Sequence, residues 1–275
     1  MSLRLRCTVR GCGRPLVREE SSLACGAGHA FDRAREGYWN LLQPQDRRSG
    51  SAGDRGEAVA ARRRWLQRGF ADELIAMLRE TAAALPAGAA GVAIDVGCGE
   101  GTVTGRVLAG RAGEACGIDL SVPAIRMAAK VLPGATWVVA NADRGLPFED
   151  GSVSLALSAF GRRPAGELSR VLAGDGFAIV VVPGPDDLVE LRAAAQGRGV
   201  RRERTPDVLA ELAPFAELIA ATRWRSVARH DREAFVDALA MSYRGGRASE
   251  RERLAGVEEI DVTLSAEILV LRRSA

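Results

Sequence analysis

Two short stretches of this 275-residue sequence hold residue types that bind ligands. Near the N-terminus, three cysteines and a histidine fall within residues 7–29, and thiolate and imidazole groups are zinc ligands. Further along, the segment AIDVGCGEGTVT at Ala93–Thr104 places three alternating glycines after a short apolar run. A glycine-rich loop that leads into a helix leaves backbone N–H groups free to bind an anionic group. The sequence therefore indicates a metal site and a cofactor loop.

The cysteine spacing predicts a structural zinc site. The pattern is Cys-x4-Cys, twelve residues, then Cys-x3-His, and residues 15–24 between the two pairs are expected to form a short hairpin. Three thiolates and one imidazole complete a tetrahedral zinc shell and leave no open position, so the metal would not be catalytic. The alternative is three unrelated thiols beside an exposed histidine, although the chain has only two histidines. The expected ligands are Cys7, Cys12, Cys25 and His29.

The glycine loop needs a strand before it and a helix after it, and the sequence predicts both. Residues 91–96 are short, apolar and bounded by glycine, which is typical of a buried strand, while residues 102–108 are predicted to form a helix. The glycines between them lack the Cβ atoms that would keep a ligand away from the backbone. The residues expected to contact a cofactor here are Asp95, Gly97, Gly99, Glu100 and Gly101.

Polar residues end the next two predicted strands. Residues 115–120 form an apolar strand about 20 residues after the loop, and the acid at its end could accept two hydrogen bonds from a ribose diol. The alternative role for this acid is to cap the following helix. Residues 135–140 form a third strand, and the polar side chains after it could hold an adenine amino group. The residues expected at these two strand ends are Asp119, Leu120, Asn141, Ala142 and Asp143.

Strands and helices alternate along the middle of the chain. This order predicts an α/β, doubly wound, Rossmann-like sheet that is mainly parallel, with its ligand crevice at the carboxyl ends of the strands and a closing hairpin at one edge. The further strands are expected at 153–160, 177–182, 226–230 and 260–271, and the further helices at 57–85 with a break near Gly69, 122–131, 165–172, 187–195 and 206–218. The expected domains are a zinc-binding module at 1–42, a linker and helical connection at 43–85, and a cofactor-binding domain at 86–275.

Composition indicates a protein of a reducing compartment. Five cysteines form no even disulfide framework, so a cytoplasmic location is expected. The N-terminus lacks the apolar run of a signal peptide, and no stretch reaches the length of a membrane span. The net charge of +3 is too small to indicate a nucleic-acid binder by itself.

The positive charge is almost all arginine, since Lys130 is the one lysine. Arginine makes bidentate contacts with phosphate and stacks on bases, which suits an RNA partner. A GC-rich genome, which favours arginine codons everywhere, is the competing explanation. The arginine runs are Arg47-Arg48, Arg62–Arg64, Arg162-Arg163 and Arg201-Arg202 with Arg204.

The order of these parts resembles a known family. DVGCGEG resembles the first motif of S-adenosylmethionine-dependent methyltransferases rather than the G-x-G-x-x-G of dinucleotide enzymes. Together with the cysteine and histidine set, other segments resemble the family that methylates N1 of a guanine in a large-subunit (23S) ribosomal RNA hairpin, some members of which confer resistance to macrolides such as tylosin. These segments are FDRAREGYWNLL, AGD-x2-E-x3-AR at Ala52–Arg62, LPF, and PGP-x2-L-x-EL at Pro183–Leu191.

The resemblance implies a class I methyltransferase domain that binds S-adenosylmethionine, a structural Zn²⁺, a ribosomal RNA partner, and a homodimer whose zinc modules frame the RNA. It implies that the loop approaches the methionine part of the cofactor, that Asp119 binds the ribose, and that Asn141–Asp143 lies by the adenine. It adds Asp187 as a cofactor contact, where the family usually has histidine.

The chain departs from the family pattern at three places. Besides Asp187, these are Ala71, where the family usually has tyrosine, and Gly161-Arg162, where it usually has Ala-Pro. Because the family positions lie near the cofactor, the changes predict altered cofactor affinity, a different target or lost activity.

The implied reaction is an in-line attack of guanine N1 on the sulfonium methyl, in which the protein aligns the two groups and helps to remove the N1 proton. Phe160 could stack on the extruded base, or it could simply pack at the end of its strand. Asp187 could accept the proton if burial raises its pKa, but no catalytic residue is assigned. The clusters Arg47-Arg48 and Arg62–Arg64 would contact RNA phosphates.

Two other functions fit parts of the sequence. A small-molecule methyltransferase would have a closed apolar pocket and no basic groove. A zinc-stabilised RNA-binding protein with a degenerate methyltransferase fold would not bind S-adenosylmethionine.

Overall fold

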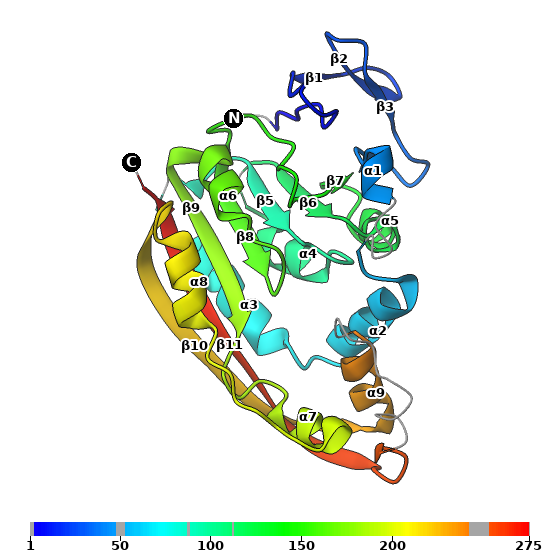
Figure 1. The fold of residues 1–275 in the computed structure, drawn as a ribbon, viewed down its shortest axis with the longest axis vertical. Coiled ribbons are helices and arrows are strands. Elements are labelled where there is room, and N and C mark those ends of the chain that lie inside the picture. Colours follow the sequence, from blue (N-terminus) through cyan, green and yellow to red (C-terminus); the bar gives the residue numbers. More distant parts are fainter. Residues whose placement is uncertain (1–2, 48–52, 87–88, 112, 242–252, 275) are drawn as a thin grey trace.

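The computed structural model describes residues 3–47, 53–86, 89–111, 113–241 and 253–274. It contains a small sheet near the N-terminus and a large sheet that organises the rest of the chain (Figure 1). Among the helices of the described ranges, none has the length and apolar character that crossing a bilayer requires.

The small sheet is built from three antiparallel strands around the cysteines. Leu16 pairs with Cys25, which confirms the hairpin predicted between the two ligand pairs. Leu23 and Phe31 are buried and belong to the same hydrophobic cluster as one face of the large sheet. The metal-binding module therefore packs against the main domain. Its strands are β1 (Leu16–Arg18), β2 (Ser22–Cys25) and β3 (Ala30–Asp32).

The large sheet has eight strands in the order β10-β11-β9-β8-β5-β6-β7-β4. The pairs from β4 to β9 are parallel, whereas β11 runs antiparallel to both β9 and β10. Because β5 pairs with β6 on one side and with β8 on the other, the strand order reverses there, and such a switch point opens a crevice at the carboxyl ends of the strands. The strands are β4 (Trp39–Asn40), β5 (Ala93–Val96), β6 (Ala115–Asp119), β7 (Thr136–Val139), β8 (Val153–Ala159), β9 (Leu172–Pro183), β10 (Ala216–Asp231) and β11 (Glu259–Arg273).

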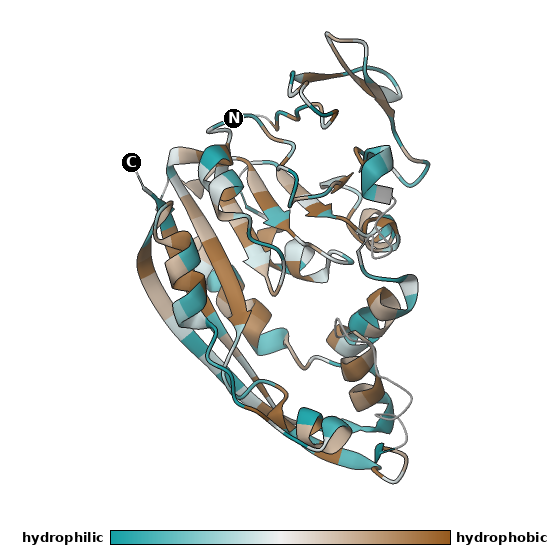
Figure 2. Ribbon diagram, viewed as in Figure 1, coloured by the Kyte–Doolittle hydropathy of each residue, from teal (hydrophilic) through white to brown (hydrophobic). Residues whose placement is uncertain are grey.

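Helices cover both faces of the sheet, as a doubly wound fold requires. Along β5, Ile94 and Val96 enter one hydrophobic cluster and Ala93 enters another, because successive side chains of a strand point to opposite faces. The strand β9 is hydrophobic along most of its length (Figure 2). The helices are α1 (Pro44–Arg47), α2 (Gly56–Gln67), α3 (Asp72–Ala83), α4 (Thr102–Leu108), α5 (Val122–Val131), α6 (Ala165–Val171), α7 (Val189–Gln196), α8 (Thr205–Leu212) and α9 (Arg232–Ala240).

Most predicted elements are confirmed, and the main errors lie near the C-terminus. The helix predicted over 206–218 ends at Leu212, because Pro214 follows closely and cannot continue a helix. From Ala216 the chain is a strand of 16 residues, far longer than the predicted 226–230, and it pairs with β11 along its length. Its apolar run has no clear period of two, so only the pairing identifies it as a strand. The strand predicted over 177–182 begins earlier, at Leu172, and ends at Pro183.

The helix α2 is fixed to the C-terminal part of the chain by buried contacts. The Trp65 indole Nε1 donates to Nε2 of His230 at 2.9 Å, and Phe70 stacks on the His230 ring at 4.1 Å between centroids. His230 Nδ1 lies 3.0 Å from the carbonyl oxygen of Ala228, so the ring is neutral with its proton on Nδ1. Burial lowers the pKa of His230 below its usual 6.5.

This neutral histidine makes stability depend on pH. Because the folded pKa of His230 is depressed, its contribution is complete above the unfolded pKa of about 6.5 and is lost as the pH falls through the folded value. We expect the free energy of unfolding of the wild type to fall relative to that of His230→Gln between pH 7.5 and pH 5, in urea titrations. Parallel pH profiles for the two proteins would contradict this assignment.

Candidate zinc and cofactor sites

The four predicted metal ligands meet in one cluster. Their donor atoms all lie within 4.8 Å of one another. Sγ of Cys12 is 3.8 Å from Sγ of Cys25, and Nδ1 of His29 is 3.4 and 3.5 Å from the Sγ atoms of Cys7 and Cys25. A tetrahedron with ordinary Zn–S and Zn–N bonds has S–S edges of about 3.8 Å and S–N edges of about 3.6 Å. The donor set and its spacing therefore fit Zn²⁺, and the module holds a structural zinc.

Tight turns bring the ligands together. The N–H of Gly28 donates to the carbonyl oxygen of Cys25 at 2.9 Å, and the N–H of Cys25 donates to that of His29 at 3.0 Å. Gly28 has a φ of +81°, a conformation that favours glycine. The second ligand pair thus depends on this glycine.

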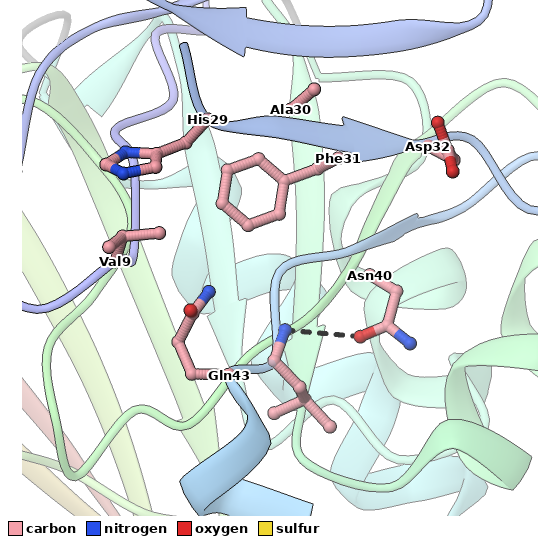
Figure 3. A pocket seen from close by; sticks show the side chains of 8 residues that line it. Val9, His29, Ala30, Phe31, Asp32, Asn40 and Gln43 are labelled. Carbon is pink, nitrogen blue, oxygen red and sulfur yellow. Dashed lines mark hydrogen bonds between the residues drawn. The ribbon is translucent and has the colours of Figure 1, made fainter. Parts of the chain in front are cut away.

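A cavity of about 520 Å³ lies between the metal-binding module, called the zinc ribbon below, and the start of the linker. Figure 3 shows His29 and Phe31 on one side of it, with Asn40 and Gln43 across from them. Amide and aromatic side chains at one opening are groups that bind unpaired bases.

The glycine loop follows β5 and is hydrogen-bonded to the neighbouring strand β6. The N–H groups of Gly97 and Cys98 donate to the carbonyl oxygen of Ile118 at 2.8 and 3.0 Å. Opposite the loop, a Cβ on Gly97 would lie 3.1 Å from Cα of Gly161, and a Cβ on Gly161 would lie 2.8 Å from the oxygen of Val96. The loops after β5 and β8 therefore touch through backbone, and glycine at position 161 is what permits this contact.

Asp119 links the loops that follow β5 and β6. Its carboxylate accepts the N–H of Gly99 at 2.9 Å and the N–H of Ser121 at 2.8 Å. Burial raises its pKa, against the lowering effect of these two donors. The alternative role as helix cap belongs instead to Ser121, whose Oγ accepts the N–H of Ala124 at 3.2 Å. Leu120 packs beside this turn in the cluster around Trp137.

Buried acids surround the loop. Asp95 accepts a hydrogen bond from Oγ1 of Thr104 at 2.5 Å, but its Oδ1 atom is buried without a partner among the described atoms. Burial, together with the charges of Asp119 and Glu100, raises the pKa of Asp95 to about 7. Glu100 is itself only 2% exposed. An acceptor without a donor and several clustered carboxylates fit a ligand with a net positive charge, as S-adenosylmethionine has at neutral pH.

The polar residues after β7 are held by neighbouring loops. Nδ2 of Asn141 donates to Oδ1 of Asp46 at 3.1 Å, and Oδ1 of Asn141 accepts the N–H of Asp143 at 3.1 Å. Arg162 forms an ion pair with Asp143 at 2.8 Å. Ala142 is half-buried against the core. The departure at Arg162 thus ties the strand ends of β7 and β8 together.

The contacts described for Asp187 and Ala71 are made with elements other than the glycine loop. Oδ1 of Asp187 accepts the N–H of Ser265 on β11 at 3.0 Å, and burial raises its pKa to about 6. Ala71 is buried at the start of α3, within the hydrophobic cluster behind the sheet.

The structure places two residues against the loop that the sequence did not predict there. Asp54 forms an ion pair with Arg62, whose Nη1 lies 3.1 Å from the position that a Cβ on Gly99 would take. The AGD-x2-E-x3-AR segment contains both residues, but the sequence alone does not separate Arg62 from the other arginines of its run. Arg64 of that run pairs instead with Asp237 on α9. Arg48 and Ala52 lie outside the described residues.

Two family models match the chain. The model described as RlmA, N-terminal, matches residues 5–50, and a methyltransferase domain model matches residues 93–176. The YcgJ protein from Bacillus subtilis is a structural neighbour with a TM-score of 0.51 and 16% identity, over 73% of this chain and 98% of that one. The fold and the loop thus define a class I methyltransferase that uses S-adenosylmethionine.

Named relatives show to which family of methyltransferases the chain belongs. The chain is 35% identical to the 23S rRNA (guanine(748)-N(1))-methyltransferase of Streptomyces fradiae, over 98% of this chain and 96% of the relative. It is 36% identical to a provisionally named 23S rRNA (guanine-N(1)-)-methyltransferase of Micromonospora griseorubida, over 68% of each. The chain belongs to the zinc-containing family of 23S rRNA (guanine-N1)-methyltransferases.

Removing the metal should unfold the ribbon and spare the cofactor site, because the two lie on different sheets. We expect one zinc per chain in the wild type and none in Cys12→Ser by atomic absorption. The variant should lose RNA affinity and keep its affinity for S-adenosylhomocysteine within about twofold. Zinc retained by Cys12→Ser would remove that residue from the ligand set.

Cofactor binding should release a proton through Asp95. Its pKa of about 7 reflects burial among other acids, and a bound positive charge would lower that pKa. At pH 6.5, calorimetry in buffers of different ionisation enthalpy should detect proton release on binding of S-adenosylmethionine. Asp95→Asn should release less, and equal release from both proteins would contradict the role of Asp95.

Proposed function

We propose that this protein transfers a methyl group from S-adenosylmethionine to N1 of a guanine in a hairpin of 23S ribosomal RNA. The observation that carries the proposal is the similarity to the Streptomyces fradiae enzyme along nearly the whole chain, zinc ribbon included. The buried acids around the glycine loop support the cofactor, since they favour a cationic ligand. A link to macrolide resistance is part of the same proposal.

The proposed cofactor contacts follow the strand ends. The loop of Gly97, Gly99 and Gly101 approaches the methionine part, Asp119 holds the ribose, and Asn141 lies by the adenine. When bound, the cofactor supplies an electrophilic methyl group on a sulfonium. Asp187, whose pKa of about 6 fits an acceptor of the N1 proton, remains a proposed contact near this site. Two of the departures from the family pattern are accommodated by the fold, since Gly161 contacts the backbone of the loop and Arg162 pairs with Asp143.

Phe160 is proposed to stack on the target base. It is 51% exposed at the carboxyl end of β8 and has a φ of +58°, a conformation rare for aromatic residues. Strained, exposed residues of this kind cluster at functional sites. The guanine would leave its helix to reach this position, because N1 faces its pairing partner in a duplex.

The RNA is proposed to contact the zinc ribbon. Five of its arginines are exposed and take part in no ion pair among the described residues, whereas Arg62 and Arg64 do. The 520 Å³ cavity beside His29 is on the same module. The exposed arginines are Arg10, Arg14, Arg18, Arg33 and Arg35.

A homodimer and a cytoplasmic location complete the proposal. The sheet ends in the edge strand β10, on which Leu218 and Ile219 are exposed, and apolar edge strands favour a protein partner. The two cysteines outside the zinc site, Cys98 and Cys116, are free thiols, which fits a reducing compartment.

Methylation at N1 can be detected because it removes the donor used in base pairing. We expect 23S rRNA incubated with the protein and S-adenosylmethionine to stop reverse transcription one nucleotide before a single guanine in a hairpin. Asp119→Ala should lower the yield at least about tenfold, because a charged hydrogen-bond partner of the ribose is lost. Methyl transfer to the RNA without a stop at guanine would contradict N1 as the acceptor.

A further inference from the structure

Arg62 lies directly against the backbone of the glycine loop. It comes from α2, and its Nη1 is 3.1 Å from the position of a Cβ on Gly99. Gly99 has a φ of +57° and no side chain, so the guanidinium occupies the space that a side chain would fill. A cation is therefore placed directly against the backbone of the loop at Gly99.

Asp54, the ion-pair partner of Arg62, is hydrogen-bonded to the turn after β6. Asp54 pairs with Arg62, and the carbonyl oxygen of Asp54 accepts the hydroxyl of Ser121 at 2.7 Å. A Cβ on Gly53 would lie 2.6 Å from the nitrogen of Ser121, so this segment packs tightly on the turn after β6. The side chains of Asp54 and Arg62 remain 33% and 29% exposed, so a ligand can reach both.

The helix that carries Arg62 is held by contacts of its last turn. Arg64 donates through Nε to Asp237 on α9 at 3.0 Å, and Trp65 donates to the buried His230. These contacts fix α2 without using Arg62. The pair of Asp54 and Arg62 is thus positioned by the fold rather than needed to hold it.

Acidic side chains outnumber basic ones around the loop. Asp95, Glu100, Asp119 and Asp54 are acids, and Arg62 is the cation that lowers the pKa of Asp119. S-adenosylmethionine has two cationic groups, the sulfonium and the α-ammonium, and one anionic group, the α-carboxylate. The acids of the protein can pair with the two cationic groups of the cofactor. The α-carboxylate of the cofactor needs a positive partner, and a guanidinium group binds a carboxylate bidentately.

We propose that the Asp54–Arg62 pair holds the zwitterionic methionine end of the cofactor, with the α-carboxylate on Arg62 and the α-ammonium on Asp54. This inference rests on the proposed function and assigns two residues to the cofactor site. It makes the pair a determinant of selectivity, since it rejects adenosine derivatives that lack the amino-acid end or its carboxylate.

Calorimetry with truncated ligands tests the assignment without measuring activity. S-adenosylhomocysteine has the whole amino-acid end, decarboxylated S-adenosylmethionine keeps only the ammonium, and 5′-methylthioadenosine has neither. Arg62→Gln should weaken S-adenosylhomocysteine binding about 10- to 100-fold, as expected for a lost charged hydrogen bond, and leave the other two ligands within about twofold. Asp54→Asn should weaken decarboxylated S-adenosylmethionine and leave 5′-methylthioadenosine unchanged.

Arg106→Gln is the matched control. Arg106 is an exposed arginine of α4 that pairs with Asp72, and its loss should change none of the three affinities. Circular dichroism checks that each variant is folded, and Arg62→Lys, which keeps the charge, should recover part of the affinity.

The outcomes separate this inference from the proposed function. If Arg62→Gln weakens 5′-methylthioadenosine as much as S-adenosylhomocysteine, Arg62 only shapes the loop and the proposal is wrong. If it weakens neither, the carboxylate lies elsewhere. If the wild type binds none of the ligands, the proposed function fails with it.

Discussion

The carboxylate of Asp119 is the constraint on which the cofactor site depends. By accepting the N–H groups of Gly99 and Ser121, it fixes the loops after β5 and β6 relative to each other at the switch point of the sheet. Two further segments pack on this junction. Gly161 packs on the loop from one side, while Gly53 and Asp54 pack on Ser121 from another. The acid thus combines a structural task with its proposed contact to ribose.

The described residues of the linker contact the strand ends that form the cofactor site. The short strand β4 pairs with β7, and Asp46 of α1 then holds Asn141 and Arg144 at the end of β7. The described chain resumes at Gly53, against the start of α5. The linker thus reaches the proposed adenine site through Asp46 and the proposed methionine site through Asp54.

Much of the fold and the zinc site could be predicted because the information is local. Ligand spacing fixes the Cys and His cluster, and short apolar strands followed by glycine or acid identify β5 and β6. The pair of Asp54 and Arg62 was missed because only tertiary packing brings α2 onto the loop. The long strand β10 was missed because pairing with β11, rather than its own pattern, determines its conformation. Gly161, a departure in the sequence, is explained by its backbone contact with Gly97.

The most direct test of the account is the identity of the methylated nucleoside. The purified protein would be incubated with 23S rRNA and methyl-labelled S-adenosylmethionine, and the digested RNA analysed by mass spectrometry against the isomeric methylguanosine standards. The account predicts label in 1-methylguanosine from a single position. Label in another isomer, or no label in RNA that the protein binds together with its cofactor, would contradict it.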